Sequence, residues 1–213
     1  MRYRHLWTEG DAARMQLIPA LAPWVYSASR PFADWYFGDP DVAAEIVHEW
    51  MSRPTAEVFV GRAIVMMGPE TESETAGCLI ALSGADLAKA RAADFAAFCH
   101  ELGSGAEAEE VIAQVVPASR ELFPPVADDE LYISRVAIDP SRRGQGLGRK
   151  LVAHTMETFR DKGFRKFRLD VSADNRAAIR AYQAAGLRII STNHSPTAGL
   201  TYCAMATAAE TAA

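Results

Sequence analysis

The chain has 213 residues, of which 49% are hydrophobic and 23% charged, and its formal net charge at pH 7 is -5. This composition is ordinary for a globular protein with a substantial core, and the acidic balance argues against a general nucleic-acid-binding protein. No run of about 20 apolar residues is present, so we expect neither a membrane span nor a signal peptide and predict a cytoplasmic location.

The cysteines also exclude some classes of protein. Cys78, Cys99 and Cys203 are odd in number, widely spaced, and form no C-x-x-C or Cys/His pattern. We therefore expect no disulfide framework and no metal site.

The first 51 residues predict a short strand followed by helices. The strand covers residues 3–7, and Thr8 is a candidate N-cap for a helix that continues to Leu21. A further helix is expected over residues 42–51, capped by Asp39 or Asp41. Aromatic residues interleaved with aspartates precede it; they could bind a cationic amine or pack the helices onto a sheet. They are Trp24, Tyr26, Trp35, Tyr36 and Phe37, with Asp34, Asp39 and Asp41.

A hairpin and a helical segment follow. Residues 57–67 and 76–83 read as two antiparallel strands joined by a polar turn. The Ala-rich segment 84–127 predicts two helices, near residues 86–102 and 107–122, separated by a Gly-Ser-Gly break. This segment could cover a substrate cleft or form a subunit contact.

A glycine-rich turn follows the next predicted strand, residues 131–138. It reads Arg142-Arg143-Gly144-Gln145-Gly146-Leu147-Gly148 and leads into a helix predicted over residues 146–162. Glycines let a backbone approach a phosphate closely, and a helix N-terminus attracts anions. The spacing G-x-G-x-G differs from the dinucleotide fingerprint, and no Walker pattern is present.

A second block follows the strand predicted over residues 164–171. A helix over residues 174–185 carries the pattern N-x-x-A-x-x-x-Y-x-x-x-G-L, formed by Asn175, Ala178, Tyr182, Gly186 and Leu187. Strands over residues 187–193 and 200–206 are expected to complete the sheet, and residues 207–213 to form a disordered tail.

Together the two blocks resemble the acyl-CoA core of the GNAT superfamily of N-acetyltransferases. The resemblance covers residues 131–187 and implies an α/β fold with a mixed, splayed central β-sheet flanked by helices. Residues 84–127 would then be a helical insertion before the central strand, within a single domain over residues 1–206. The implied reaction moves an acetyl group from acetyl-CoA to a primary amine of a small molecule or peptide, by direct attack in a ternary complex. Relatives often form homodimers, so a homodimer is an open possibility here.

The resemblance also implies which residues hold the cosubstrate. The backbone of Val136, Ala137 and Ile138 would pair with the pantetheine arm. The pyrophosphate would be held by N–H groups of Arg143, Gly144, Gln145, Gly146, Leu147 and Gly148. Asn175 would contact the cosubstrate; alternatively it is a helix N-cap, a role for which Asp174 competes.

Tyr182 is the predicted general acid, because a phenol with a pKa of about 10 can protonate the departing thiolate. Glu130 is the candidate general base, with Asp129, Asp170 and a water chain as alternatives. A different class of function also stays open: a non-catalytic acyl-CoA sensor or partner-binding module on the same fold. Tyr182 argues against it, because a binding module needs no proton donor.

Overall fold

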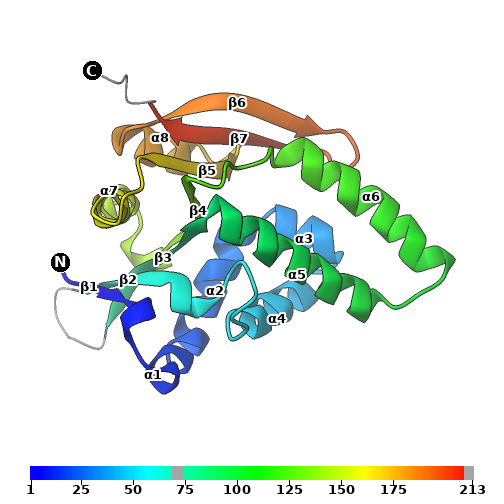
Figure 1. The fold of residues 1–213 in the computed structure, drawn as a ribbon, viewed down its shortest axis with the longest axis horizontal. Helices are drawn as coiled ribbons and strands as arrows, with labels where there is room; N and C mark the ends of the chain where they lie inside the picture. Colours follow the sequence, from blue (N-terminus) through cyan, green and yellow to red (C-terminus); the bar gives the residue numbers. More distant parts are fainter. Residues whose placement is uncertain (69–73, 209–213) are drawn as a thin grey trace.

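A mixed sheet is the centre of the computed structural model, which describes residues 1–68 and 74–208. Its seven strands have the order β1-β2-β3-β4-β5-β7-β6 (Figure 1), and all neighbours pair antiparallel except β4 and β5, which are parallel. The strands are β1 Tyr3–His5, β2 Ala63–Met67, β3 Thr75–Ser83, β4 Glu130–Ile138, β5 Lys166–Ser172, β6 Leu187–Ser195 and β7 Leu200–Thr207. The predicted fold class is confirmed.

Helices cover both faces of this sheet. They are α1 Asp11–Met15, α2 Ile18–Ser29, α3 Phe32–Phe37, α4 Pro40–Trp50, α5 Gly84–Leu102, α6 Ala106–Leu122, α7 Leu147–Arg160 and α8 Arg176–Ala184. Alternate strand residues bury against opposite helices, as the two-residue period of a strand requires. Ile64 and Met66 pack in one core with Leu151 of α7, whereas Val65 packs in the other with Leu21 of α2.

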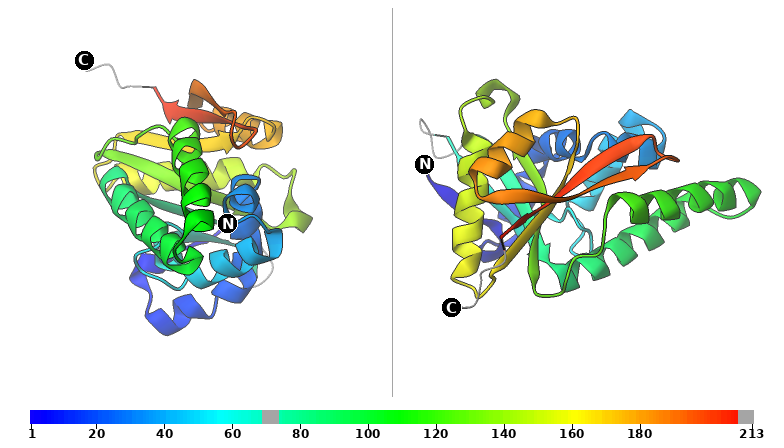
Figure 2. Two further views of the ribbon diagram at one scale, coloured as in Figure 1. Left: turned by 90° about the vertical axis from the view of Figure 1, so that its right-hand side faces the viewer. Right: turned by 90° about the horizontal axis from the view of Figure 1, so that it is seen from above.

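The helices α5 and α6 lie between β3 and β4 in the chain, as predicted. They extend together away from the sheet, and Figure 2 shows them from two sides. No helix in the described part of the chain is both long and apolar enough to cross a membrane.

A β-bulge in β4 redirects its side chains. Ile80 of β3 pairs with Arg135 and Ala81 pairs with Ile133, so Ser134 is the extra residue. A bulge bends the strand and shifts the alternation of its side chains by one position. Tyr132 and Arg135 therefore line the same cavity although they are three residues apart.

The strands β4 and β5 separate soon after they meet. Their parallel pairing covers only Glu130 with Lys166, Leu131 with Phe167, and Tyr132 with Arg168. Beyond Tyr132, β4 still pairs with β3 and β5 pairs with β7. The sheet is therefore splayed at the ends from which α7 and α8 begin.

Two local predictions were wrong in the first half of the chain. The strand predicted over residues 57–67 begins only at Ala63, because the Arg62 guanidinium donates to the backbone carbonyls of Pro54 and Ala56 and holds the preceding segment in a turn. Thr8 caps no helix: its hydroxyl donates to the carbonyl of His5, and α1 begins after Gly10.

Other element boundaries differ less. The helix predicted to run to Leu21 is broken before α2, which starts with a proline in its first turn, where a missing N–H costs nothing. Asp39, one of the two predicted caps, accepts hydrogen bonds from the N–H groups of Asp41 and Val42 at 2.8 and 3.1 Å. β7 runs to Thr207, and residues 209–213 of the predicted tail lie outside the described residues.

Candidate active site

The glycine-rich turn forms an open loop between β4 and α7. Gly144 and Gly146 adopt φ values of +80° and +71°, which favour glycine, and no atom lies within 4 Å of where a Cβ would stand. Gly146 is the N-cap of the fourteen-residue α7 and supplies no side-chain cap. The first N–H groups of α7 therefore remain available to an anionic ligand.

A small cavity of about 60 Å³ lies where β4 and β5 diverge, and we call it the splay cavity. It is lined by Ala28, Arg30, Ile133, Ser134, Val136, Leu169, Asp170, Val171, Ser172, Asn175, Tyr182 and Tyr202. The fold thus brings together four of the residues singled out from the sequence, Val136, Asp170, Asn175 and Tyr182. Ala137 instead turns its side chain into the core beneath α2.

Tyr182 is buried on the inner face of α8, where its ring joins the core. Its hydroxyl makes no hydrogen bond to another residue within the described parts of the chain. Burial raises the pKa of Tyr182 above that of a free phenol, so the hydroxyl stays protonated at neutral pH. A protonated, unengaged hydroxyl facing the splay cavity can donate to a ligand there.

Asn175 is the N-cap of α8, as the second interpretation of this residue predicted. Its Oδ1 accepts a hydrogen bond from the N–H of Ala178 at 3.1 Å. The side-chain amide still has two N–H donors at the wall of the splay cavity. Contact between Asn175 and a cosubstrate stays a prediction.

Asp170 lies on β5 with its side chain 1% exposed. The Tyr132 hydroxyl donates to its Oδ2 at 3.1 Å, while its Oδ1 has no hydrogen bond in the described chain and lies 3.9 Å from Nη2 of Arg168. Burial raises the pKa of Asp170 to about 6, although Arg168 and Arg91 act in the opposite direction. This carboxyl group can therefore change its protonation state near neutral pH.

The other two candidate bases lie elsewhere. Glu130 is at the paired end of β4, where its Oε2 accepts a hydrogen bond from the N–H of Ala127 at 2.8 Å. Asp129 forms an exposed ion pair with Lys166 at 2.8 Å. Neither lines the splay cavity, so of the three candidate carboxylates Asp170 alone shares it with Tyr182.

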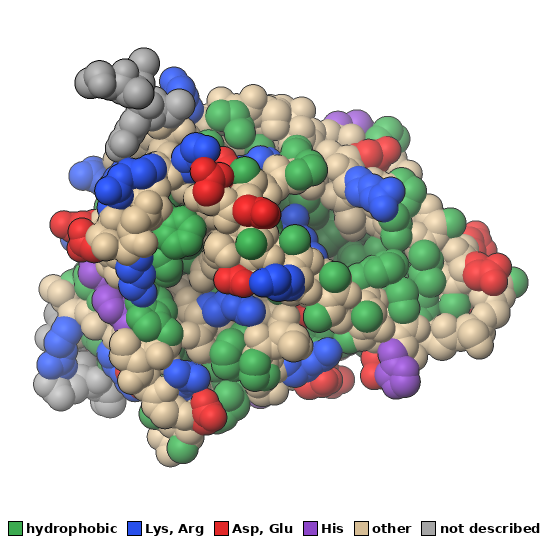
Figure 3. Space-filling model, in the orientation of Figure 1, with side chains coloured by type: hydrophobic (Ala, Val, Ile, Leu, Met, Phe, Trp, Pro, Cys, Tyr) green, Lys and Arg blue, Asp and Glu red, His purple; other side chains and the backbone are tan. Residues whose placement is uncertain are grey.

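A second cavity, of about 480 Å³, lies between α3 and α4 on one side and α5 and α6 on the other; we call it the large cavity. Figure 3 shows hydrophobic side chains gathered around a hollow next to α6. The large cavity is lined by Ser29, Phe32, Ala33, Tyr36, Phe37, Val47, Trp50, Glu57, Val58, Arg91, Ala92, Asp94, Phe95, Val115, Val116, Ser119, Arg120, Phe123, Tyr132 and Arg135.

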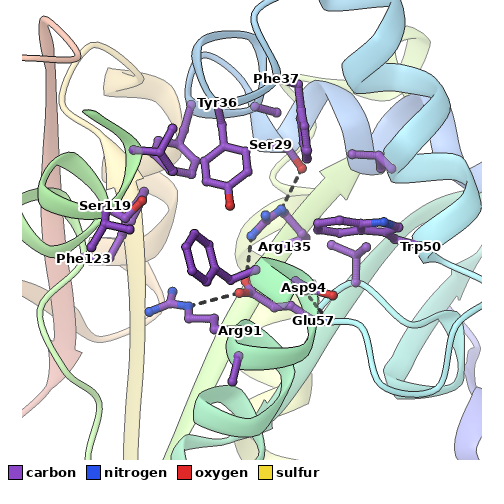
Figure 4. Close-up of a pocket in the computed structure, with 18 of the residues that line it drawn as sticks. Ser29, Tyr36, Phe37, Trp50, Glu57, Arg91, Asp94, Ser119, Phe123 and Arg135 are labelled. Carbon is purple, nitrogen blue, oxygen red and sulfur yellow. Dashed lines mark hydrogen bonds and ion pairs between the residues drawn. The ribbon is translucent and has the colours of Figure 1, made fainter. Parts of the chain in front are cut away.

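A buried ion cluster forms the floor of the large cavity. Arg91 and Arg135 both point toward Glu57 (Figure 4), and their N–H groups lie 3.1 Å from its two carboxylate oxygens. The Ser134 hydroxyl donates to Glu57 at 2.6 Å. Burial alone would raise the pKa of Glu57, but the two guanidinium groups outweigh it and hold that pKa at about 2.

Sequence reasoning missed this cluster. Arg91 lies 34 residues from Glu57, and Arg135 lies 78 residues from it, so no local motif joins them. Arg91 also donates to the Tyr132 hydroxyl at 3.2 Å, and that hydroxyl donates to Asp170. The two cavities are therefore connected by hydrogen bonds.

The N-terminal aromatic residues divide between their two predicted roles. Tyr36 and Phe37 line the large cavity, which is consistent with ligand contact. Trp24 and Tyr26 pack against the core beneath α2, and the Tyr26 hydroxyl donates to Asp34 at 2.7 Å.

The model of the Acetyltransferase (GNAT) family matches residues 30–187, which is most of the chain. The chain belongs to the GNAT acetyltransferase family. The match includes both motifs, the glycine-rich loop and the helix that carries Tyr182, and it confirms the resemblance seen in the sequence.

Relatives support this assignment over shorter segments. The chain is 37% identical over 71 residues to the [Ribosomal protein bS18]-alanine N-acetyltransferase of Escherichia coli, a segment that covers 32% of this chain and 48% of that protein. The match thus spans about half the length of this curated relative.

Solved structures match over nearly the whole chain. An N-acetyltransferase from Staphylococcus aureus Mu50 superposes with a TM-score of 0.65 at 21% identity, over 97% of this chain and 100% of that one. The aminoglycoside acetyltransferase AAC(6')-Ib in complex with coenzyme A gives a TM-score of 0.54 at 20% identity, over 92% of this chain and 91% of that one. At these identities the likeness concerns the fold.

Proposed function

We propose that the chain transfers an acetyl group from acetyl-CoA to a primary amine of a small molecule or peptide. The observation that carries the proposal is the meeting of Tyr182, Asp170 and Asn175 in the splay cavity. A proton donor, a carboxylate and an amide thus converge at the point where the parallel strands open. Membership of an acetyltransferase family supports the same reaction.

The residues present fit an acyl-CoA cosubstrate. Because β5 does not pair with β4 beyond Tyr132, the backbone of Val136, Ala137 and Ile138 can pair with the amide groups of a pantetheine arm. The N–H groups of residues 143–148 would hold the pyrophosphate, and the open space around Gly144 and Gly146 admits it. Coenzyme A is the ligand of the aminoglycoside acetyltransferase that shares this fold.

Tyr182 is the general acid in this proposal. When an amine attacks the thioester carbonyl, the C–S bond breaks and the departing thiolate takes a proton. The Tyr182 hydroxyl, protonated and otherwise unengaged, supplies it. General acid catalysis of this kind contributes about 10²- to 10⁴-fold in rate.

Asp170, rather than Glu130, is the general base in this proposal. An alkylamine with a pKa of about 10.4 is mostly protonated at neutral pH and has to lose a proton to react. Asp170 lies in the same cavity as Tyr182 and keeps one oxygen free of hydrogen bonds in the described chain, whereas Glu130 caps a turn at the other end of β4.

Direct attack by the amine, without an acyl-enzyme, is supported by the positions of the cysteines. Cys78 and Cys203 are buried, and none of the three cysteines lines the splay cavity. The acceptor thus reacts in a ternary complex. The relatives named above act on a ribosomal-protein alanine and on aminoglycosides, so both peptide and small-molecule amines belong in the first assay.

The proposal is tested by measuring free-thiol release from acetyl-CoA with a panel of amines and peptides, for the wild type and Tyr182→Phe. We expect kcat/KM to fall about 10²- to 10⁴-fold in Tyr182→Phe, with the affinity for CoA measured by calorimetry unchanged. Tyr3→Phe removes a phenol that stacks on His154 far from the splay cavity and serves as the control. Equal turnover by Tyr182→Phe and wild type would contradict the role of Tyr182. CoA binding without turnover on any acceptor would instead favour the sensor function.

A further inference from the structure

The large cavity and the splay cavity are built on the same two elements. On α2, Ser29 lines the large cavity, and its neighbours Ala28 and Arg30 line the splay cavity. On β4, the bulge turns Arg135 into the large cavity and Val136 into the splay cavity. A molecule in the large cavity is therefore adjacent to the proposed reaction centre.

Three aromatic rings in mutual contact connect the linings of the two cavities. Phe32 and Phe123 line the large cavity, and Tyr202 lines the splay cavity. The Phe123 ring lies 4.7 Å from that of Phe32 and 5.0 Å from that of Tyr202, between ring centroids. The N–H of Phe32 also donates to the Tyr202 hydroxyl at 3.3 Å. Packed rings thus run from the lining of the large cavity to that of the splay cavity.

The wall of the large cavity is aromatic. Phe32, Tyr36, Phe37, Trp50, Phe95 and Phe123 contribute to it from α3, α4, α5 and the residue after α6. Its volume of about 480 Å³ is in the usual range for a small-molecule site. Such a wall favours an apolar body, whose transfer from water is the main source of binding free energy.

The charges of the large cavity do not favour a polycation. Three arginines line it, Arg91, Arg120 and Arg135, against two carboxylates, Glu57 and Asp94. Glu57 is fully engaged with Arg91, Arg135 and a serine hydroxyl. Asp94 accepts a hydrogen bond from the N–H of Glu57 on its Oδ2 at 2.9 Å, its Oδ1 has no hydrogen bond in the described chain, and burial raises its pKa to about 6. The three guanidinium charges still outnumber the two carboxylates, so the lining as a whole disfavours a second ammonium group.

We propose that the large cavity is the acceptor site and that its substrate is a primary monoamine carried on an aromatic or bulky apolar body. The inference rests on the proposed function, because it assumes that an amine receives the acetyl group. The body of the acceptor occupies the large cavity, and its amino group passes Phe123 and Tyr202 to reach the splay cavity.

The first test compares acceptors that differ only in their body or in a second charge. Propylamine, benzylamine and 4-phenylbutylamine form a size series, and 1,4-bis(aminomethyl)benzene, spermidine, an aminoglycoside and an alanyl peptide supply the contrast. We expect kcat/KM to rise about tenfold or more along the size series, since a methylene in an apolar pocket changes it by about that factor. The second ammonium of the bis-amine should lower it below the value for benzylamine. Faster turnover of spermidine, the aminoglycoside or the peptide would overturn the proposal.

The second test narrows the cavity. Ala92 of α5 lines it, whereas Ala96, one turn further along the same exposed side of the helix, does not. We expect Ala92→Trp to lower kcat/KM for 4-phenylbutylamine about tenfold, mainly through KM, and to leave propylamine within about twofold, because the added ring fills space only the larger body needs. Ala96→Trp should change neither. Equal effects of both variants, or none from Ala92→Trp, would contradict the assignment of the cavity.

The third test reverses the charge preference. Ser119 of α6 lines the large cavity and has no basic residue three or four positions away on the helix, and Val111 of the same helix does not line the cavity. Ser119→Glu adds a carboxylate to the cavity wall and should raise the ratio of kcat/KM for 1,4-bis(aminomethyl)benzene to that for benzylamine about tenfold. This is the order of discrimination that one buried charge pair provides. Val111→Glu should leave this ratio at the wild-type value; an unchanged ratio in Ser119→Glu would count against the proposal.

The same assays separate the two proposals. Absence of turnover on every amine, with CoA still bound, defeats the proposed function and this inference with it. Turnover that depends on Tyr182 but prefers spermidine or the peptide, and that ignores Ala92→Trp, leaves the proposed function intact and defeats only the assignment of the large cavity.

Discussion

Glu57 in the large cavity and Asp170 in the splay cavity are both buried carboxylates, and hydrogen bonds through Arg91 and Tyr132 connect them. Their surroundings act on them in opposite directions. Two guanidinium groups and a hydroxyl engage Glu57, and its pKa is held at about 2. Asp170 has one hydrogen bond and a distant arginine, and burial raises its pKa to about 6.

This difference separates a structural role from a chemical one. A carboxylate whose oxygens are both paired keeps its charge at any physiological pH and fixes the elements around it, here the segment before β2, α5 and β4. In a buried carboxylate with one oxygen free of hydrogen bonds, the charged form is destabilised, so the pKa is raised and the group can exchange a proton near neutral pH. In the proposed reaction the group that exchanges a proton thus lies beside the two motifs, whereas the carboxylate that stays ionised joins the segment before β2 to α5 and β4.

The largest expected effect is that of Asp170→Asn on catalysis. Loss of the proposed general base should lower kcat/KM about 10²- to 10⁴-fold. In the wild type kcat/KM should rise as the pH increases through about 6, because the carboxylate of Asp170 forms there. In Asp170→Asn this rise of kcat/KM with pH should be absent. Steady-state kinetics from pH 5 to pH 8 provide the measurement. Glu130→Gln makes the same chemical change at the other end of β4 and should retain wild-type kcat/KM; a large loss there would return Glu130 to the role of base.

Glu57→Gln should instead act on stability. Removal of the charge leaves the half-buried Arg91 and Arg135 without their carboxylate partner, which costs about 2 kcal/mol of unfolding free energy. Because the folded-state pKa of Glu57 lies below its ordinary value of 4.5, its contribution is complete above pH 4.5 and is lost as the pH falls toward 2. Urea denaturation at pH 7 and pH 3 should therefore show a deficit in Glu57→Gln that shrinks at the lower pH. A constant deficit would show that packing, not charge, is responsible.

The contrast between the regions also explains what the sequence could predict. The glycine loop belongs to the unit formed by β4, the loop and α7, and Asn175 and Tyr182 belong to the unit formed by β5, a turn and α8. Because each motif is local, its spacing along the chain determines its geometry. The splayed sheet was predicted from the family resemblance and not from spacing. The helices of the insertion were predicted from their periodicity and their Gly-Ser-Gly break.

The large cavity could not be predicted in this way. The ion cluster joins Glu57 to residues 34 and 78 positions away, and only the folded sheet brings them together. The bulge at Ser134 leaves no local mark in the sequence, yet it decides that Tyr132 and Arg135 share a cavity. The choice between Glu130 and Asp170 depended on the same information, since Glu130 directly precedes one predicted strand, Asp170 lies near the end of another, and the sequence does not say which of them faces Tyr182.

A further consequence of the contrast is that Asp170 should destabilise the fold at neutral pH. Its folded-state pKa of about 6 lies above the ordinary 3.8, so ionisation favours the unfolded chain as the pH rises between these values. Asp170→Asn removes that penalty. We expect the unfolding free energy of the variant minus that of the wild type to be about 2 kcal/mol larger at pH 8 than at pH 4.5, so the variant gains stability as the pH rises. Denaturation of both proteins at both pH values tests this; a difference independent of pH would refute the raised pKa.

The smallest expected effect concerns the glycine loop. Gly146→Ala makes no clash with the protein, since no atom lies within 4 Å of the new Cβ, but it forces a φ of +71° on a residue that resists it. The cost is about 1 kcal/mol, so calorimetry should show CoA binding weakened about fivefold if the loop relaxes away from this geometry in the free variant. Gly10→Ala, at the N-cap of α1 with a negative φ, adds the same methyl group without that cost and should bind CoA as the wild type does. Equal affinity in all three proteins would mean that the conformation of Gly146 does not contribute to the cosubstrate site, and that the anion is held by the N–H groups of α7 and its flanking charges alone.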